Sequence, residues 1–135
     1  MVDGSFKRLD ILPLSQAIYE REMSLNIPDK KIAKIWAVIQ AIPKGTVASY
    51  GQVADLAGLP GRARLTARAL RLAPNDMKLP WFRVLRSNGQ LAPQVAQRQK
   101  ALLKQDGILV TNNRVKLAQY QWQPSLADML FILEE

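Results

Sequence analysis

The chain has 135 residues, of which 48% are apolar and 22% charged, and its formal net charge is +8 at pH 7. It contains neither cysteine nor histidine, which excludes disulfides, thiolate nucleophiles, imidazole bases and the usual zinc-ligand sets. The length favours one domain with a hydrophobic core, and the positive charge favours a polyanionic partner such as nucleic acid. No apolar run approaches the roughly 18 residues of a membrane span, so we expect a soluble, cytoplasmic protein without a membrane partner.

The first 30 residues are nearly charge-balanced, with four bases and five acids. Leu14, Ile18 and Leu25 recur there at a spacing that favours one amphipathic helix. This extension is expected either to pack on the main domain or to bind a partner.

An amphipathic helix is predicted to begin near Lys30, with Asp29 as its cap, and to end before Pro43. The spacing of its apolar residues assigns Trp36 to the hydrophobic core. These apolar residues are Ile32, Ile35, Trp36 and Ile39.

A turn at residues 44–45 and a β-prone piece over residues 46–48 lead to Ser49. Ser49 is a predicted cap for a short helix from Gln52 to Leu56. A turn rich in glycine and proline, residues 57–61, ends that helix.

A third helix is predicted from Arg62 to Leu72, because Leu65, Ala69 and Leu72 fall on one of its faces. A short helix, a turn and a basic helix in this order are typical of a helix-turn-helix.

The segment from Gly61 to Arg86 concentrates the positive charge, with seven bases against one acid, Asp76. Three of these arginines stand at i, i+4 and i+7 of the third helix. Such a patch is suited to a phosphate backbone. The seven bases are Arg62, Arg64, Arg68, Arg71, Lys78, Arg83 and Arg86.

Residues 78–85, a turn at 87–89 and a return over 90–92 predict a β-hairpin or wing. A helix is expected from Gln94 to Gln105, ended by Asp106-Gly107. Its predicted inward residues are Val95, Leu102 and Leu103, and its outward ones are Arg98, Lys100 and Lys104.

A second hairpin is predicted from residues 108–110 through the turn Asn112-Asn113 to residues 115–117. The tail from Leu126 onward predicts a short amphipathic helix that docks on the domain, with a dimer contact as the alternative. Its apolar face is predicted to hold Leu126, Met129, Leu130 and Leu133.

The sequence Pro80-Trp81-Phe82-Arg83-Val84, together with Tyr50 and Arg64, resembles the DNA-binding domain of the O6-alkylguanine-DNA alkyltransferases. The reactive motif of that family is Pro-Cys-His-Arg-Val. Here tryptophan stands at the position of the acceptor cysteine, a replacement that marks the alkyltransferase-like proteins.

The resemblance covers residues 31–123, and it implies an N-terminal extension over residues 1–30 and a separate C-terminal helix over residues 124–135. The implied fold is mainly α with small β-hairpins, a winged helix-turn-helix of the alkyltransferase C-terminal type.

The same resemblance implies a non-enzymatic protein that binds O6-alkylguanine in duplex DNA from the minor groove and flips the damaged base into a pocket. Such a protein would direct the lesion to nucleotide excision repair. It would act as a monomer, with nucleotide excision repair proteins as partners and without cofactor or metal. It would be associated with the nucleoid when bound to DNA.

Site roles are also implied by the resemblance. Tyr50 would crowd the 3′ phosphate of the flipped nucleotide, and Arg64 would fill the vacated place in the base stack. Trp81 would form the floor or wall of the pocket, with Phe82 as packing beside it. The predicted DNA- and lesion-binding residues are Tyr50, Arg64, Ala67, Arg68, Arg71, Pro80, Trp81, Phe82 and Arg83.

The chain departs from the family pattern at several positions. Thr66-Ala67-Arg68 replaces a Val-Gly-Gly run of the recognition helix, and the arginine either obstructs the narrow minor groove or binds a phosphate. The loop after Gly89 is shorter than the usual pocket loop. Ala73 and Asp106 stand at the family's asparagine and glutamate positions, as expected where no thiolate must be activated.

Two alternatives remain open on the residues alone. A winged-helix transcription regulator would share the charge and the helix order, in which case Arg64 would be a phosphate contact and Tyr50 a core aromatic. The motif over residues 80–84 favours lesion binding, because a regulator has no use for it. A glycosylase-like enzyme would need Asp55, Asp76 or Asp106, and these show no paired-carboxylate spacing.

Overall fold

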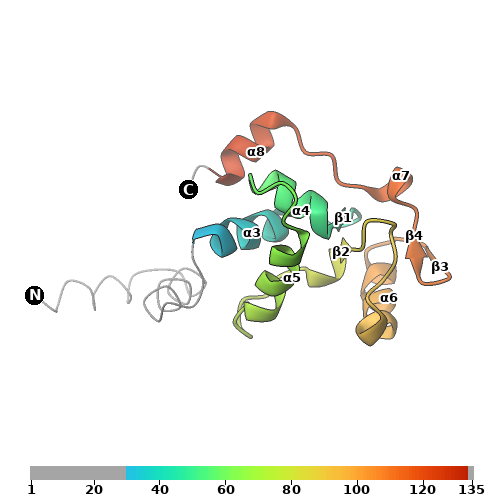
Figure 1. Ribbon diagram of the computed structural model, residues 1–135. Helices are drawn as coiled ribbons and strands as arrows, with labels where there is room; N and C mark the ends of the chain where they lie inside the picture. Colours follow the sequence, from blue (N-terminus) through green and yellow to red (C-terminus); the bar gives the residue numbers. More distant parts are fainter. Residues whose placement is uncertain (1–29, 134–135) are drawn as a thin grey trace, which may run out of the picture.

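The computed structural model describes residues 30–133, so the predicted N-terminal helix with Leu14, Ile18 and Leu25 lies outside the described residues. Helices predominate, with two small strand pairs among them (Figure 1). The predicted mainly α class is confirmed. In chain order the elements are α3 (Lys30–Ala41), β1 (Ala48–Ser49), α4 (Tyr50–Leu56), α5 (Ala63–Leu72), the 3₁₀ helix η1 (Trp81–Arg83), β2 (Val84–Leu85), the 3₁₀ helix η2 (Pro93–Val95), α6 (Ala96–Gln105), β3 (Val110–Thr111), β4 (Arg114–Val115), α7 (Leu117–Tyr120) and α8 (Leu126–Leu133).

The larger of two hydrophobic clusters forms around α3. Ile35 and Ile39 are fully buried there. The Trp36 indole Nε1 donates a hydrogen bond of 2.7 Å to the Ala69 carbonyl, which ties α3 to α5. The predicted first helix and the core position of Trp36 are confirmed.

The helix-turn-helix consists of α4 and α5, which pack against each other. Ser49 caps α4 as predicted, because its side-chain oxygen accepts a hydrogen bond from the Gln52 amide. The turn between the helices contains Gly58 and Gly61, both at positive φ, where a side chain would be strained. Thr66 of α5 donates through Oγ1 to the Tyr50 carbonyl at 3.0 Å, which fixes α5 against the start of α4.

The predicted hairpin over residues 78–92 is wrong in its strand pairing. The turn forms, since the Gly89 amide donates to the Arg86 carbonyl. However, η1 replaces the middle of the expected first strand, and β2 pairs in parallel with β1 instead of with residues 90–92. Pro80 has no amide to donate to a strand partner, and the Arg83 amide donates to the Pro80 carbonyl, so the chain winds into a helical turn.

The second predicted hairpin, β3–β4, is confirmed. Asn112 and Asn113 have φ values of 53° and 57°, the left-handed conformation that two-residue hairpin turns require. Gly89 packs so closely on this hairpin that a Cβ there would overlap the Val115 carbonyl oxygen.

A second hydrophobic cluster lies between α6 and the β3–β4 hairpin. The predicted helix over residues 94–105 is present as η2 followed by α6. Leu103 is fully buried, whereas Val95 and Leu102 are half-buried.

The C-terminal helix α8 is confirmed and packs on α3. The predicted apolar face is wrong in part, because Leu126 and Leu130 are exposed. Met129 is buried, and Ile132 and Leu133 pack on the first cluster beside it. Since α8 is apolar at nearly every position, the sequence pattern left the buried face undefined.

None of the helices between residues 30 and 133 combines the length and apolar character that crossing a bilayer requires.

Candidate nucleic-acid interface

A cavity of about 380 Å³ lies between α5, η1 and the start of α6. Its walls combine aliphatic side chains and a tryptophan with two arginines, a tyrosine and a glutamine. Four of the nine predicted site residues line it, and the rest lie outside. The lining residues are Tyr50, Ala67, Leu70, Arg71, Trp81, Val84, Ala92, Val95, Arg98 and Gln99.

The exposed face of α5 borders this cavity. Arg64, Ala67, Arg68 and Arg71 follow one another at three- and four-residue spacing, so they share one face of the helix. Ala67 and Arg71 line the cavity. Arg64 and Arg68 lie on the same face outside it, with both side chains exposed. The cavity thus opens beside a row of cations.

Trp81 lines the cavity from η1. The guanidinium carbon of Arg98 lies 5.5 Å from the centre of the Trp81 ring, a cation–π contact that holds the ring between α6 and the cavity. Sequence reasoning assigned Arg98 to the outer face of its helix and missed this contact. The sequence did hold a signal for this contact, since Arg98 follows Val95, which was predicted to face inward, by one helical turn.

Gln99 is a second residue that sequence reasoning missed. Its side chain is only 1% exposed, and its amide nitrogen donates to the Phe82 and Val84 carbonyls at 3.1 and 3.2 Å. Its amide oxygen accepts from the Ala92 amide at 3.1 Å. One side chain therefore fixes the two backbone segments that flank the cavity. The sequence did hold a signal for its burial. Gln99 lies four positions after Val95 and four before Leu103, both predicted to face inward, so it shares their face of the helix.

Tyr50 reaches the cavity from the first position of α4, directly after the Ser49 cap. Burial raises the pKa of the Tyr50 phenol above its ordinary value, and the nearby positive charge of Arg86 lowers it by a smaller amount. The phenol is therefore protonated at neutral pH and can donate a hydrogen bond.

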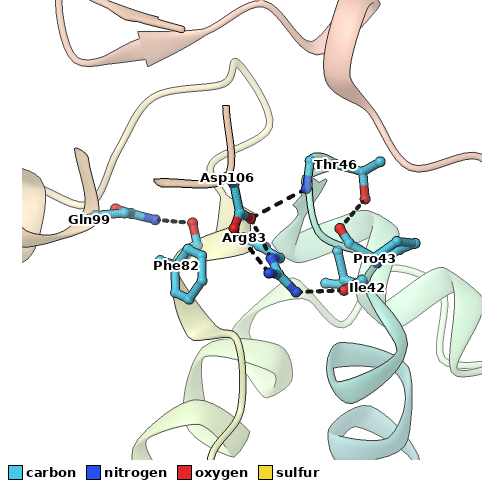
Figure 2. A network of polar contacts seen from close by, with 8 residues as sticks. Ile42, Pro43, Thr46, Phe82, Arg83, Gln99 and Asp106 are labelled. Carbon is cyan, nitrogen blue, oxygen red and sulfur yellow. Dashed lines mark hydrogen bonds and ion pairs between the residues drawn. The ribbon is translucent and has the colours of Figure 1, made fainter. Parts of the chain in front are cut away.

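Arg83 faces the interior (Figure 2). Its Nε and Nη2 atoms bind both carboxylate oxygens of Asp106, at 2.6 and 3.1 Å, and its Nη1 donates to the Ile42 carbonyl at 2.9 Å. The side chains of Arg83 and Asp106 are 16% and 6% exposed. All three nitrogens of the guanidinium are thus engaged within the protein.

The remaining motif residues, Pro80 and Phe82, also lie outside the cavity lining. Pro80 precedes η1 as its cap residue. Phe82 packs against the second hydrophobic cluster and meets the Trp81 ring edge-on, with 6.1 Å between ring centroids. Phe82 is thus placed as packing beside Trp81.

Residues 31–108 match the family described as the DNA-binding domain of 6-O-methylguanine DNA methyltransferase. The chain belongs to this family. The resemblance that Trp81 and its neighbours carry in the sequence is confirmed, and so is the alkyltransferase-like fold.

Individual members of the family are similar over most of their length. The chain is 43% identical over 99 residues to the DNA base-flipping protein of Vibrio parahaemolyticus, covering 71% of this chain and 99% of that protein. It is 29% identical over 105 residues to alkyltransferase-like protein 1 of Schizosaccharomyces pombe, covering 71% and 97%. The crystal structure of S. pombe Atl1 in complex with damaged DNA containing O6-carboxymethylguanine matches with a TM-score of 0.66 and 28% identity, covering 72% of this chain and 98% of Atl1.

Although it belongs to the methyltransferase DNA-binding-domain family, the chain contains no cysteine. The acids that a glycosylase-like mechanism would need are also absent from the cavity lining: Asp55 and Asp76 are exposed elsewhere, and Asp106 is held by Arg83. Among residues 30–133 no cluster of three acidic, histidine or cysteine side chains could hold a metal ion.

Proposed function

We propose that this protein recognises O6-alkylguanine in duplex DNA, flips the damaged base into the cavity beside α5, and leaves the alkyl group in place. The observation that carries this proposal is a cavity that combines Trp81 in its wall with the arginine face of α5 at its border. The named function of the Vibrio relative and the damaged DNA bound to S. pombe Atl1 support the same class of activity.

The α5 face is suited to the DNA backbone. Arg64, Arg68 and Arg71 are exposed, so each can reach a phosphate without being desolvated in the free protein. Ala67 lies between them, and its small side chain permits close approach to a groove about 6 Å wide. We assign Arg68 to a phosphate contact, because its exposed side chain can extend along the groove edge.

The cavity is suited to a flipped purine. Its volume of about 380 Å³ lies within the range typical of small-molecule sites. Tyr50 at its wall would press on the phosphate of the rotated nucleotide, and Arg64, outside the cavity, would occupy the gap left in the stack. Filling that gap offsets part of the few kcal/mol that base rotation costs.

Trp81 would contact the base and its alkyl group through the face or edge of its ring. Its position corresponds to the acceptor cysteine of the family, yet an indole offers no thiolate to receive an alkyl group. Arg98 would hold the ring in place. We therefore propose a non-enzymatic role.

Arg83 we assign to positioning rather than to direct contact with DNA. Its guanidinium is committed to Asp106 and Ile42, so reaching a phosphate would require breaking a largely buried ion pair. It would act by fixing η1, and with it Trp81.

A lesion that is bound but not reversed must be removed by another system. For this reason we propose that the protein passes the lesion to nucleotide excision repair proteins. We also propose that it acts as a monomer and is associated with the nucleoid when bound to DNA. The motif over residues 80–84 favours lesion binding over the regulator alternative, because a regulator has no use for it.

The test is a titration of matched duplexes that carry guanine or O6-methylguanine at one site, at fixed salt. We expect tighter binding to the methylated duplex. Trp81→Ala should reduce that discrimination by about tenfold, the scale of losing one base–aromatic contact, while changing plain-duplex affinity little. The exposed residue Gln94 provides a control variant, Gln94→Ala, which should behave as the unmodified protein. Equal affinity for both duplexes would refute lesion recognition.

A further inference from the structure

Leu109 is 66% exposed, and between residues 30 and 133 it is the one exposed large apolar side chain outside α8. A single exposed leucine is ordinary on a protein surface. This leucine, however, lines two neighbouring cavities of about 440 and 230 Å³. The larger cavity is lined also by residues of α7, and the smaller by residues of α6. Leu109 is therefore an apolar side chain shared by two hollows of the surface.

Four cations flank Leu109. Lys100 and Lys104 line the smaller cavity from α6, whereas Arg114 and Lys116 line the larger one from β4 and the residue after it. All four are exposed, and none forms an ion pair with an acid among residues 30–133. This surface is here called the Leu109 face, and it consists of Leu109, Lys100, Lys104, Arg114 and Lys116.

The positive charge of the Leu109 face is not compensated locally. Residues 96–127 contain five bases, and Asp106 is their only acid. The Asp106 carboxylate is bound by Arg83, and its side chain is only 6% exposed. An apolar centre with a cationic rim is complementary to an apolar side chain that is flanked by carboxylates.

Local contacts hold the apolar centre in place. The Leu109 amide donates a hydrogen bond of 3.3 Å to the Tyr120 hydroxyl. Of its two chain neighbours, Ile108 is buried and Val110 packs on the second hydrophobic cluster. The Leu109 face is therefore formed before any partner binds, which lowers the entropic cost of association.

The Leu109 face and the α5 cavity lie on different sides of α6. Arg98, which lines the cavity, directly precedes the buried residue Gln99, and Lys100 directly follows it. Because an α-helix turns by about 100° per residue, Arg98 and Lys100 diverge from the buried stripe in opposite directions. In Figure 1, α6 correspondingly stands between α5 and the β3–β4 hairpin. A molecule bound to the Leu109 face therefore leaves the α5 cavity free.

The lining of the larger cavity favours a protein over nucleic acid. Beside Leu109 it includes the apolar side chains of Leu117 and Ala118 and the ring of Tyr120. Apolar centres of this kind are typical of protein–protein interfaces. Interfaces with DNA are more polar, because most of their contacts go to phosphates and sugars.

We propose that the Leu109 face binds an acidic segment of a partner protein. An apolar side chain of that segment would pack on Leu109 between the two cavities, and its carboxylates would lie beside the four cations. The interaction does not depend on lesion recognition, because the Leu109 face lies outside the α5 cavity. A partner could thus be held while DNA is bound.

The probe is a short fluorescein-labelled peptide of glutamates with interspersed leucines, titrated with the full chain and followed by fluorescence anisotropy. We expect binding that weakens as salt rises, and binding at least about tenfold weaker for a matched peptide with serine in place of leucine. Leu109→Ser should weaken binding of the leucine peptide about tenfold, the scale of burying one leucine side chain. Lys104→Ala should weaken it about threefold, the scale of one exposed ion pair.

Two control variants alter the same residue types elsewhere. Leu130→Ser changes an exposed leucine of α8, and Lys34→Ala changes an exposed lysine of α3. Both should bind the peptide as the unmodified protein does. Urea unfolding checks that all four variants are folded.

A saturating amount of plain duplex DNA should leave the peptide bound. Displacement by the duplex would place the peptide on the α5 face and overturn the proposal. Equal binding to Leu109→Ser and Leu130→Ser, or no binding at about 1 mM protein, would overturn it as well. If Leu109→Ser lost as much duplex affinity as Arg68→Ala, the Leu109 face would belong to the DNA interface instead, and the proposal would be wrong.

Discussion

Three consecutive residues of the motif face three different parts of the molecule. A 3₁₀ helix has about three residues per turn, so neighbouring side chains diverge by about 120°. Trp81 lines the cavity, Phe82 packs on the second hydrophobic cluster, and Arg83 binds Asp106. The motif therefore combines one cavity residue with two residues that hold it in place.

Arg64 and Arg71 share a helix face but should differ in role. If Arg64 fills the vacated stack, Arg64→Ala should abolish the fluorescence change of a 2-aminopurine beside the lesion and leave the salt slope of binding nearly unchanged. Arg71→Ala, which removes a phosphate contact, should lower the slope by about one unit and weaken all sequences alike. Identical slopes and fluorescence for the two variants would contradict the base-flipping assignment of Arg64.

The raised pKa of Tyr50 predicts a pH dependence of stability. The folded state favours the protonated phenol, so the contribution of that proton to the free energy of unfolding is complete below about pH 10, the ordinary pKa of tyrosine. It is lost as the pH rises through the higher folded-state value. Tyr50→Phe cannot ionise.

The stability difference between the two proteins, measured by urea unfolding, should be constant near neutral pH. The free energy of unfolding of the unmodified protein should fall relative to that of Tyr50→Phe only above about pH 10. A shift of the same size below about pH 9 would contradict this assignment.

At the scale of elements, the cavity is held together by polar side chains that bridge segments distant in sequence. Gln99 of α6 binds backbone groups of η1, β2 and the loop before η2. The Arg83–Asp106 pair joins η1 to the end of α6, and Arg83 also binds Ile42 just after α3 (Figure 2). The orientation of Trp81 thus depends on contacts made by two other elements.

Asp106→Asn tests this coupling. The substitution removes one charge of a largely buried ion pair, so it should lower the free energy of unfolding by about 3 kcal/mol. It should also weaken lesion discrimination, because η1 carries Trp81. Asp76→Asn alters an exposed acid and should do neither. Urea unfolding measures the first effect and duplex titration the second. Equal stability of both variants would show that the ion pair contributes nothing net.

At the scale of the whole molecule, positive charge is concentrated in α5 and the residues that flank it in the chain. Of the seven bases between Gly61 and Arg86, six are exposed and Arg83 is not. Affinity for plain duplex DNA should therefore fall steeply with salt through counterion release. Arg83 should not contribute to the slope.

Binding isotherms at several salt concentrations measure this dependence. A flat dependence would exclude phosphate binding by the α5 face. Arg83→Gln should leave the slope unchanged even if it weakens the fold, whereas Arg68→Ala should lower it by about one unit because it removes a phosphate contact.

Local sequence signals determined a large part of this fold. Apolar spacing located α3, α5 and α6, the oxygen of Ser49 capped α4, and Asn112-Asn113 formed the β3–β4 turn, because each depends on residues close in the chain. Trp81 at the acceptor position was likewise readable from the motif, and the match over residues 31–108 confirmed the family that the motif indicated.

Tertiary structure alone decided the rest. The pairing of β2 with β1 joins residues 36 positions apart in the chain, and no hairpin signal encodes such a parallel contact. The burial of Arg83 depends on Asp106 and Ile42 lying beside it, and the roles of Arg98 and Gln99 depend on α6 packing against η1. Which side of α8 is buried depends on its contact with α3, since its own sequence is apolar on every side.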